Sequence, residues 1–145
     1  MKKLIIANSG KTCQGKSSSI KELFAQLKAK YPSDCNNVSN GYDITGTIEI
    51  KGYLVGITSY GDPGPQMPEA MDEFVKKGCQ IIVSACRTKS NTHAKIRDIA
   101  QGYDYDIIWA SNDRTDISPE LKNTLNQRYA ERVIQLIEDR INGII

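Results

Sequence analysis

The segment L-I-I-A-N-S-G-K-T-C-Q-G-K-S-S-S-I-K-E-L-F, residues 4–24, sets the pattern for the chain. Its first four residues are apolar and predict a buried strand, and apolar residues recur at helical spacing from Ile20 onward. Between them, Gly10 to Ser17 fits the pattern G-x-x-x-x-G-K-[ST]. The sequence therefore predicts a strand, a glycine-containing turn and a helix in direct succession.

The fixed positions of this pattern suit the binding of phosphate. Gly10 and Gly15 let the backbone turn tightly and approach an anion where a Cβ atom would clash. The N–H groups of the turn and of the helix start form a concave anion site, which the helix dipole favours. Lys16 adds a charge that reaches β- and γ-phosphates, and the Ser17 hydroxyl can ligate Mg²⁺. We expect a phosphate-binding loop; a surface turn that binds nothing is the alternative.

Residues 4–24 resemble the Walker A loop of the P-loop NTPase superfamily, and the order of elements in the rest of the chain is compatible with that superfamily. The resemblance implies Mg²⁺ and ATP or GTP as cofactors. The residues that it assigns to cofactor binding are Gly10, Lys11, Thr12, Cys13, Gln14, Gly15, Lys16, Ser17 and Ser18.

Length and composition indicate one ordinary globular domain spanning residues 1–145. The chain is 39% hydrophobic and 25% charged, and its net charge of +2 points neither to nucleic acid nor to a membrane as partner. No secretory leader or membrane-spanning run is recognisable, and the four cysteines lack metal-ligand spacing. We therefore expect a cytoplasmic protein with reduced thiols.

The segment after the first helix predicts a loop and then a hairpin. The helix is expected to end at Pro32, and the polar stretch Ser33 to Asp43 is expected to be a loop. Residues 47–50 alternate in character and residues 53–58 are nearly all apolar, which predicts an antiparallel hairpin with an edge strand beside a buried one. Small GTPase-like P-loop domains pair two strands in this way, and this favours a GTPase-like topology over a kinase-like one.

The order β-α-(ββ)-α-β-α-β-α predicts a three-layer fold with a mainly parallel five-stranded sheet and helices on both faces. The later helices are expected to begin at Pro68, Thr92 and Ser118-Pro119, and the later strands to cover residues 81–83 and 106–110. In the last helix, one apolar stripe is expected to pack against the sheet; its members are Leu121, Leu125, Tyr129, Val133, Leu136, Ile137 and Ile141.

Asp62 is the candidate metal ligand after Ser17. It lies in the loop Ser59 to Pro68, which follows a buried strand, and P-loop proteins usually place an Asp at the end of this strand to hold Mg²⁺ directly or through water. Here the strand ends with Thr58-Ser59, and Asp62 follows a few residues late. Two interpretations stay open, a metal ligand and a solvated turn carboxylate.

Two arginines are candidate phosphate contacts. Arg87 lies in the loop Ser84 to Thr92, and Arg114 lies in the loop Ser111 to Pro119. Arginine can bind phosphates and transition-state charge in phosphoryl transfer. The alternatives are a polar loop with Thr92 capping the next helix, and an ordinary surface arginine at 114.

These residues predict a nucleotide site at the carboxyl edge of the sheet, with Lys16, Asp62, Arg87 and Arg114 as catalytic residues and Ser17 and Asp62 at the metal. One hypothesis is an enzyme that hydrolyses a nucleoside triphosphate or transfers its γ-phosphoryl group to a small acceptor such as a nucleotide, with Asp62 or Asp43 beside the acceptor hydroxyl. The other is a nucleotide-binding regulatory module with slow or no turnover. The base, ATP or GTP, stays open, and nucleic acid and membrane are not expected as partners.

Overall fold

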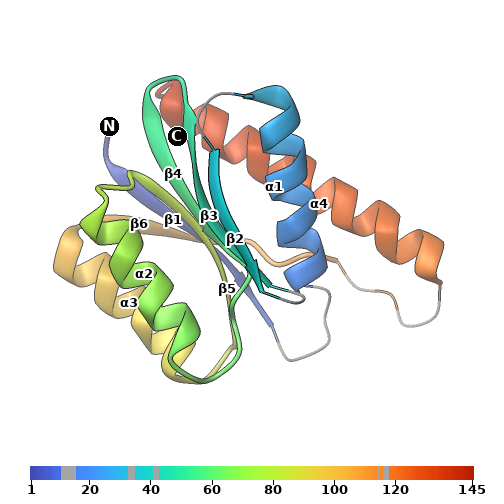
Figure 1. Ribbon diagram of the computed structural model, residues 1–145, viewed down its shortest axis with the longest axis horizontal. Helices are drawn as coiled ribbons and strands as arrows, with labels where there is room; N and C mark the ends of the chain where they lie inside the picture. Colours follow the sequence, from blue (N-terminus) through green and yellow to red (C-terminus); the bar gives the residue numbers. More distant parts are fainter. Residues whose placement is uncertain (11–15, 33–34, 41–42, 114, 116–117) are drawn as a thin grey trace.

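The computed structural model describes residues 1–10, 16–32, 35–40, 43–113, 115 and 118–145. One mixed sheet separates two pairs of helices, with α1 and α4 on one face and α2 and α3 on the other (Figure 1). The elements are β1 (Lys3–Ser9), α1 (Lys16–Lys30), β2 (Cys35–Asn40), β3 (Asp43–Ile50), β4 (Tyr53–Thr58), α2 (Gln66–Lys76), β5 (Ile81–Cys86), α3 (Asn91–Tyr103), β6 (Tyr105–Trp109) and α4 (Pro119–Ile141).

The strand order is β2-β3-β4-β5-β1-β6. Strands β4, β5, β1 and β6 run parallel to one another, and β3 runs antiparallel to both of its neighbours. The carboxyl ends of β1, β4, β5 and β6 therefore meet at one edge of the sheet, and the first residue of β3 lies at that same edge.

All five expected strands are present, and the antiparallel hairpin of β3 and β4 is confirmed. The loop expected over Ser33 to Asp43 is wrong, because residues 35–40 form β2. The sequence C-N-N-V-S-N is polar and favours a strand only weakly, but its backbone pairs antiparallel with β3 from Cys35 to Asn40. As a result β3 is an internal strand and not the expected edge strand.

Strand β1 is buried on both faces, as its apolar run predicts. Leu4 and Ile6 pack into the core formed with α1 and α4. Ile5 and Ala7 point the other way, into the core formed with α2 and α3. Because side chains alternate along a strand, Asn8 follows Leu4 and Ile6 toward the α1 side.

The expected stripe of α4 is only partly buried. Tyr129, Val133 and Ile137 are buried against the sheet side, whereas Leu121 is 46% exposed. Figure 1 shows why: the N-terminal part of α4 extends past the edge of the sheet, so it has no sheet surface to cover. None of the helices in the described ranges is long and apolar enough to cross a membrane.

The residue expected as the N-cap of α3 is also wrong. Ser90, and not Thr92, is the N-cap, and its side chain accepts a hydrogen bond from the backbone N–H of Thr92. Thr92 is the second residue of the helix and is fully buried. Its hydroxyl is therefore available for contacts between loops, which are described below.

Candidate functional site

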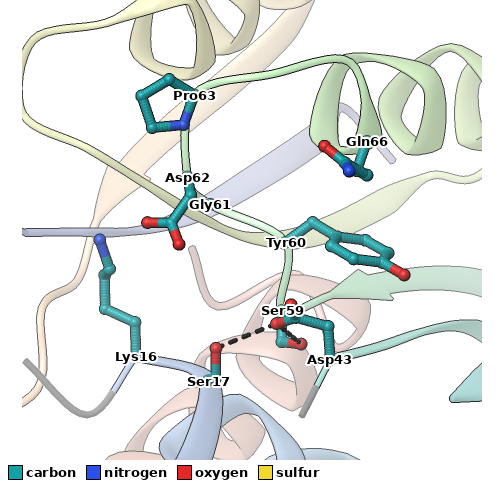
Figure 2. A pocket seen from close by; sticks show the side chains of 9 residues that line it. All are labelled: Lys16, Ser17, Asp43, Ser59, Tyr60, Gly61, Asp62, Pro63 and Gln66. Atoms are coloured by element: carbon teal, nitrogen blue, oxygen red, sulfur yellow. Dashed lines mark hydrogen bonds between the residues drawn. The ribbon is translucent and has the colours of Figure 1, made fainter. Parts of the chain in front are cut away.

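A polar pocket of about 230 Å³ opens at the carboxyl edge of the sheet, next to the end of β4. Ligands of open α/β sheets bind at this edge, because the loops that follow the parallel strands meet there. Figure 2 shows the lining side chains, which come from the start of α1, the start of β3, the loop between β4 and α2, and the first residue of α2. They are Lys16, Ser17, Asp43, Ser59, Tyr60, Gly61, Asp62, Pro63 and Gln66.

Lys16 is the first residue of α1 and is only 7% exposed. Its Nζ atom donates hydrogen bonds to the carbonyl oxygens of Gly10, at 2.5 Å, and Cys86, at 3.1 Å. Those carbonyls lie at the ends of β1 and β5, which are neighbours in the sheet. Burial lowers the pKa of Lys16, and the nearby Asp62 carboxylate opposes this shift. The ammonium group is thus held where two parallel strands end.

The hydroxyl of Ser17 contacts a carboxylate from another element. Its Oγ atom donates to the Oδ1 atom of Asp43 at 3.1 Å, and the Oγ atom of Ser59 donates to the same oxygen at 2.9 Å. The position of Ser59 is fixed in turn, because its Oγ atom accepts from the N–H of Ile44 at 2.8 Å. Since β3 runs antiparallel to β4, its first residue, Asp43, lies beside the residue that follows β4.

Asp62 faces cations. The Nε and Nη2 atoms of Arg87 each lie 3.3 Å from its Oδ1 atom. Figure 2 shows the Asp62 carboxylate and the Lys16 side chain pointing toward each other. The Asp62 side chain is 67% exposed, so it stays well hydrated. Among the described residues, the carboxylate that contacts Ser17 is therefore Asp43, and Asp62 pairs with Arg87.

Thr92 joins the two loops that carry this ion pair. Its Oγ1 atom donates to the carbonyl of Gly61 at 3.1 Å and accepts from the N–H of Arg87 at 3.1 Å. Asn91 adds a hydrogen bond to the carbonyl of Gly64 at 3.0 Å. Gly61 itself packs so closely on β5 that an added Cβ atom would lie 2.7 Å from the Cβ atom of Ala85. The backbones on both sides of the ion pair are thus fixed against each other.

A buried polar network lies beneath the first turn of α1. The Nδ2 atom of Asn8, which is fully buried, contacts the Oγ atom of Ser19 at 3.2 Å and the Oδ1 atom of Asn112 at 3.1 Å. Ser19 also donates to the carbonyl of Lys16 at 3.0 Å. This network ties the end of β1 and the loop after β6 to the residue that carries the buried ammonium.

The structure brings together Lys16, Ser17 and Asp62 in one pocket, with Arg87 beside it. Gly10 lies at the end of β1 and donates its N–H to the carbonyl of Cys86 at 3.0 Å, and Ser18 is exposed outside the pocket lining. The other predicted residues lie outside the described part of the chain; they are Lys11, Thr12, Cys13, Gln14, Gly15 and Arg114.

The sequence did not predict the contacts that two of the pocket residues make. Asp43 was expected only as a carboxylate for an acceptor, and Ser59 only as the end of a strand. Asp43 accepts hydrogen bonds from Ser17 and Ser59, and this arrangement depends on the register of β3 with β4, in which Thr45 pairs with Thr58. Asp43, the carboxylate that precedes the predicted hairpin, and Ser59, the residue after its second strand, were the signal that could have found this cluster.

The donor atoms around Ser17 are two hydroxyl oxygens and a carboxylate oxygen. Hard oxygen donors of this kind suit Mg²⁺, which binds few protein ligands and keeps several waters. Over the described ranges, no group of three or more His, Cys, Asp or Glu side chains is placed to hold a metal ion by itself. The chemistry thus fits a cation that a bound anion would help to hold.

Fold and pocket together define an α/β protein with a polar, charged pocket at the carboxyl edge of a mostly parallel sheet. A scan against protein-family models, a search of curated proteins and a search of solved structures each found no match to this chain.

Proposed function

We propose that this protein is a P-loop nucleotide-binding protein that binds a magnesium nucleoside triphosphate and transfers its γ-phosphoryl group to water or to a small acceptor. One observation carries the proposal: at the start of α1, the Lys16 ammonium and the Ser17–Asp43 contact lie next to each other in a single pocket. Lys16 and Ser17 are the last two positions of the G-x-x-x-x-G-K-[ST] pattern that predicts a phosphate-binding loop.

Lys16 would bind the phosphates. Its ammonium has a lowered pKa because it is buried. Within the described part of the chain, its hydrogen-bond partners are two backbone carbonyls. A phosphate oxygen at this position would offer a full negative charge to a poorly hydrated cation, which makes the interaction stronger than in water. The start of α1 adds the favourable end of the helix dipole.

Ser17 and Asp43 would hold the magnesium ion, with Ser59 fixing the carboxylate. When bound, Mg²⁺ supplies charge that neutralises phosphate oxygens. The hydrogen bond of Ser59 restrains the Asp43 carboxylate next to the Ser17 hydroxyl. Outer contacts of this kind typically matter for metal affinity because they orient the ligand.

Catalysis would consist of positioning and charge stabilisation by the chain. Lys16 orients the phosphates, and Arg87, which follows β5 at the same edge, can add a second positive charge. Tyr60 and Gln66 line the part of the pocket nearest α2, where a water or a small acceptor hydroxyl can enter. The chain thus offers two cations, one metal-binding carboxylate and polar side chains around one cavity.

The experiment compares Lys16→Ala with Lys28→Ala. Lys28 is an exposed lysine on the same helix and outside the pocket. We expect the Lys16 variant to lose phosphate release by at least about a hundredfold, the scale for removing one group that stabilises transition-state charge, and Lys28→Ala to behave as wild type. Thermal unfolding checks that both variants are folded.

Equal phosphate release by wild type and the Lys16 variant would contradict the proposal. Binding of nucleotide that depends on Lys16, without phosphate release, would instead indicate the regulatory module that the sequence left open. Transfer to an acceptor is distinguished from hydrolysis by release that appears only when a candidate acceptor nucleotide is added.

A further inference from the structure

We propose that Asp62 is a built-in counter-ion that competes with the terminal phosphate of the ligand for Lys16 and Arg87, and that it thereby weakens the binding of triphosphates relative to diphosphates. This inference rests on the proposed nucleotide-binding function. It assigns Asp62 a role other than that of a metal ligand, which the sequence had suggested.

The first support is the position of Asp62 between two cations. It forms an ion pair with Arg87, at 3.3 Å, and points toward Lys16 in the pocket. The hydroxyl of Ser17 contacts Asp43 instead, so the metal-ligand chemistry and the Asp62 carboxylate lie on different sides of the pocket.

The second support is that the ion pair is easy to exchange. The Nε and Nη2 atoms of Arg87 contact a single oxygen of Asp62, at 3.3 Å each, whereas strong charge-assisted pairs are shorter and use both oxygens. The two side chains are 35% and 67% exposed, and exposed pairs of this kind contribute little stability. A phosphate with two free oxygens would offer Arg87 a better partner.

The third support is the fixed backbone around the pair. Thr92 connects Gly61 to Arg87, and Asn91 contacts Gly64. Arg87 and Asp62 can therefore exchange partners by side-chain rotation while their loops stay in place. This is the arrangement expected of a competing counter-ion, because displacement costs no refolding of the loops.

Competition by Asp62 has a defined consequence for ligand choice. A diphosphate can occupy the Lys16 position without displacing Asp62 from Arg87. A triphosphate brings a further phosphate, and this phosphate has to take Arg87 from Asp62 and lie close to its charge. Removing the charge of Asp62 should therefore strengthen triphosphate binding more than diphosphate binding.

The test measures Kd by calorimetry, with and without Mg²⁺, for the β,γ-imido analogues of ATP and GTP and for ADP and GDP. The variants are Asp62→Asn, Arg87→Gln and the double variant. Asp72→Asn is the matched control, because Asp72 is a similarly exposed carboxylate, 61% exposed, in an ion pair with Lys95 and outside the pocket. It changes the net charge by the same amount as Asp62→Asn.

For Asp62→Asn we expect triphosphate analogues to bind about fivefold more tightly, the upper range for a partly exposed ion pair, with a smaller change for diphosphates. Arg87→Gln should weaken triphosphate binding about fivefold, and the double variant should lose the gain of Asp62→Asn, because no arginine is left to release. Asp72→Asn should match wild type.

Unchanged or weaker triphosphate binding by Asp62→Asn, in a protein whose wild type binds nucleotide, would overturn this inference alone. Loss of the magnesium dependence in that variant would show instead that Asp62 holds the metal. Binding of none of the four nucleotides by wild type or Asp62→Asn would overturn the proposed function together with this inference.

Discussion

The Oγ atom of Ser17 lies 3.1 Å from the carboxylate of Asp43, and this contact joins the first turn of α1 to the first residue of β3. The two residues are 26 positions apart in the sequence. The antiparallel turn of β3 back along β4 brings them together at the edge where the parallel strands end. In the proposed function they form the metal-binding side of the pocket.

Asp43→Asn is therefore expected to weaken the effect of Mg²⁺ on nucleotide affinity. The asparagine keeps an oxygen that accepts the hydrogen bonds of Ser17 and Ser59, so the fold should persist, but it loses the charge that binds the cation. We expect the stimulation by Mg²⁺ to fall by about tenfold or more. Calorimetry with and without Mg²⁺ measures this change.

Asp98→Asn is the control for that variant, because Asp98 is an exposed carboxylate on α3, away from the pocket lining. It should keep the wild-type response to Mg²⁺. A full magnesium response in the Asp43 variant would show that the metal is held elsewhere.

Gly61→Ala should destabilise the loop that carries Asp62. The new Cβ atom would lie 2.7 Å from the Cβ atom of Ala85 and 3.1 Å from the backbone nitrogen of Cys86, so backbone would have to move. We expect a loss of about 1–3 kcal/mol in the free energy of unfolding. Urea unfolding measures this loss.

Gly102→Ala is the matched glycine substitution, since nothing lies within 4 Å of a Cβ atom at this position in α3. It should leave the protein as stable as wild type or raise the free energy of unfolding by about 0.5–1 kcal/mol, because alanine favours the helix. Equal stabilities of the two alanine variants would contradict the close packing of Gly61 on β5.

Glu138→Gln should lower the free energy of unfolding at neutral pH and make it depend less on pH in the acid range. Lys30 and the hydroxyl of Tyr31 contact the Glu138 carboxylate, which is 15% exposed, and hold its pKa below the ordinary value of 4.5. A lowered pKa in the folded state contributes stability above the unfolded pKa, and this stability is lost as the pH falls through the folded pKa. We expect a loss of about 1 kcal/mol at pH 7.

Urea unfolding at pH 7 and at several values below about pH 5 separates that contribution, because the difference between wild type and variant should shrink in acid. Glu131→Gln is the control on the same helix: its pair with Arg128 is 53% and 70% exposed and should contribute almost nothing. A difference between wild type and the Glu138 variant that stays constant with pH would contradict a lowered pKa of Glu138.

Local sequence signals were sufficient for most of the fold. The apolar run of β1, the break at Pro32 and the Ser118-Pro119 start of α4 each depend on neighbouring residues, and each element lies where it was expected. Strand β2 could not be predicted in this way, because its polar residues are extended only through pairing with β3. The exposure of Leu121 could not be predicted either, because it depends on where the sheet ends and not on helical spacing.

In the candidate site, too, the residues of one contiguous pattern could be predicted, whereas contacts between separate segments could not. Lys16 and Ser17 belong to one contiguous pattern, so the sequence could assign them together. Asp43 reaches the site through the register of a hairpin, and Thr92 through the packing of two loops, so neither role follows from spacing along the chain. Asp62 was found as a carboxylate, but its pairing with Arg87 is a contact between separate loops.

The most direct measurement is isothermal titration of wild-type protein with ATP and GTP, with and without Mg²⁺, followed by phosphate release on the same samples. We expect binding of at least one of the two nucleotides that strengthens with Mg²⁺ and is followed by phosphate release. No binding of either nucleotide, in protein shown to be folded by its thermal unfolding, would contradict the assignment of Lys16, Ser17 and Asp43 to a nucleotide site.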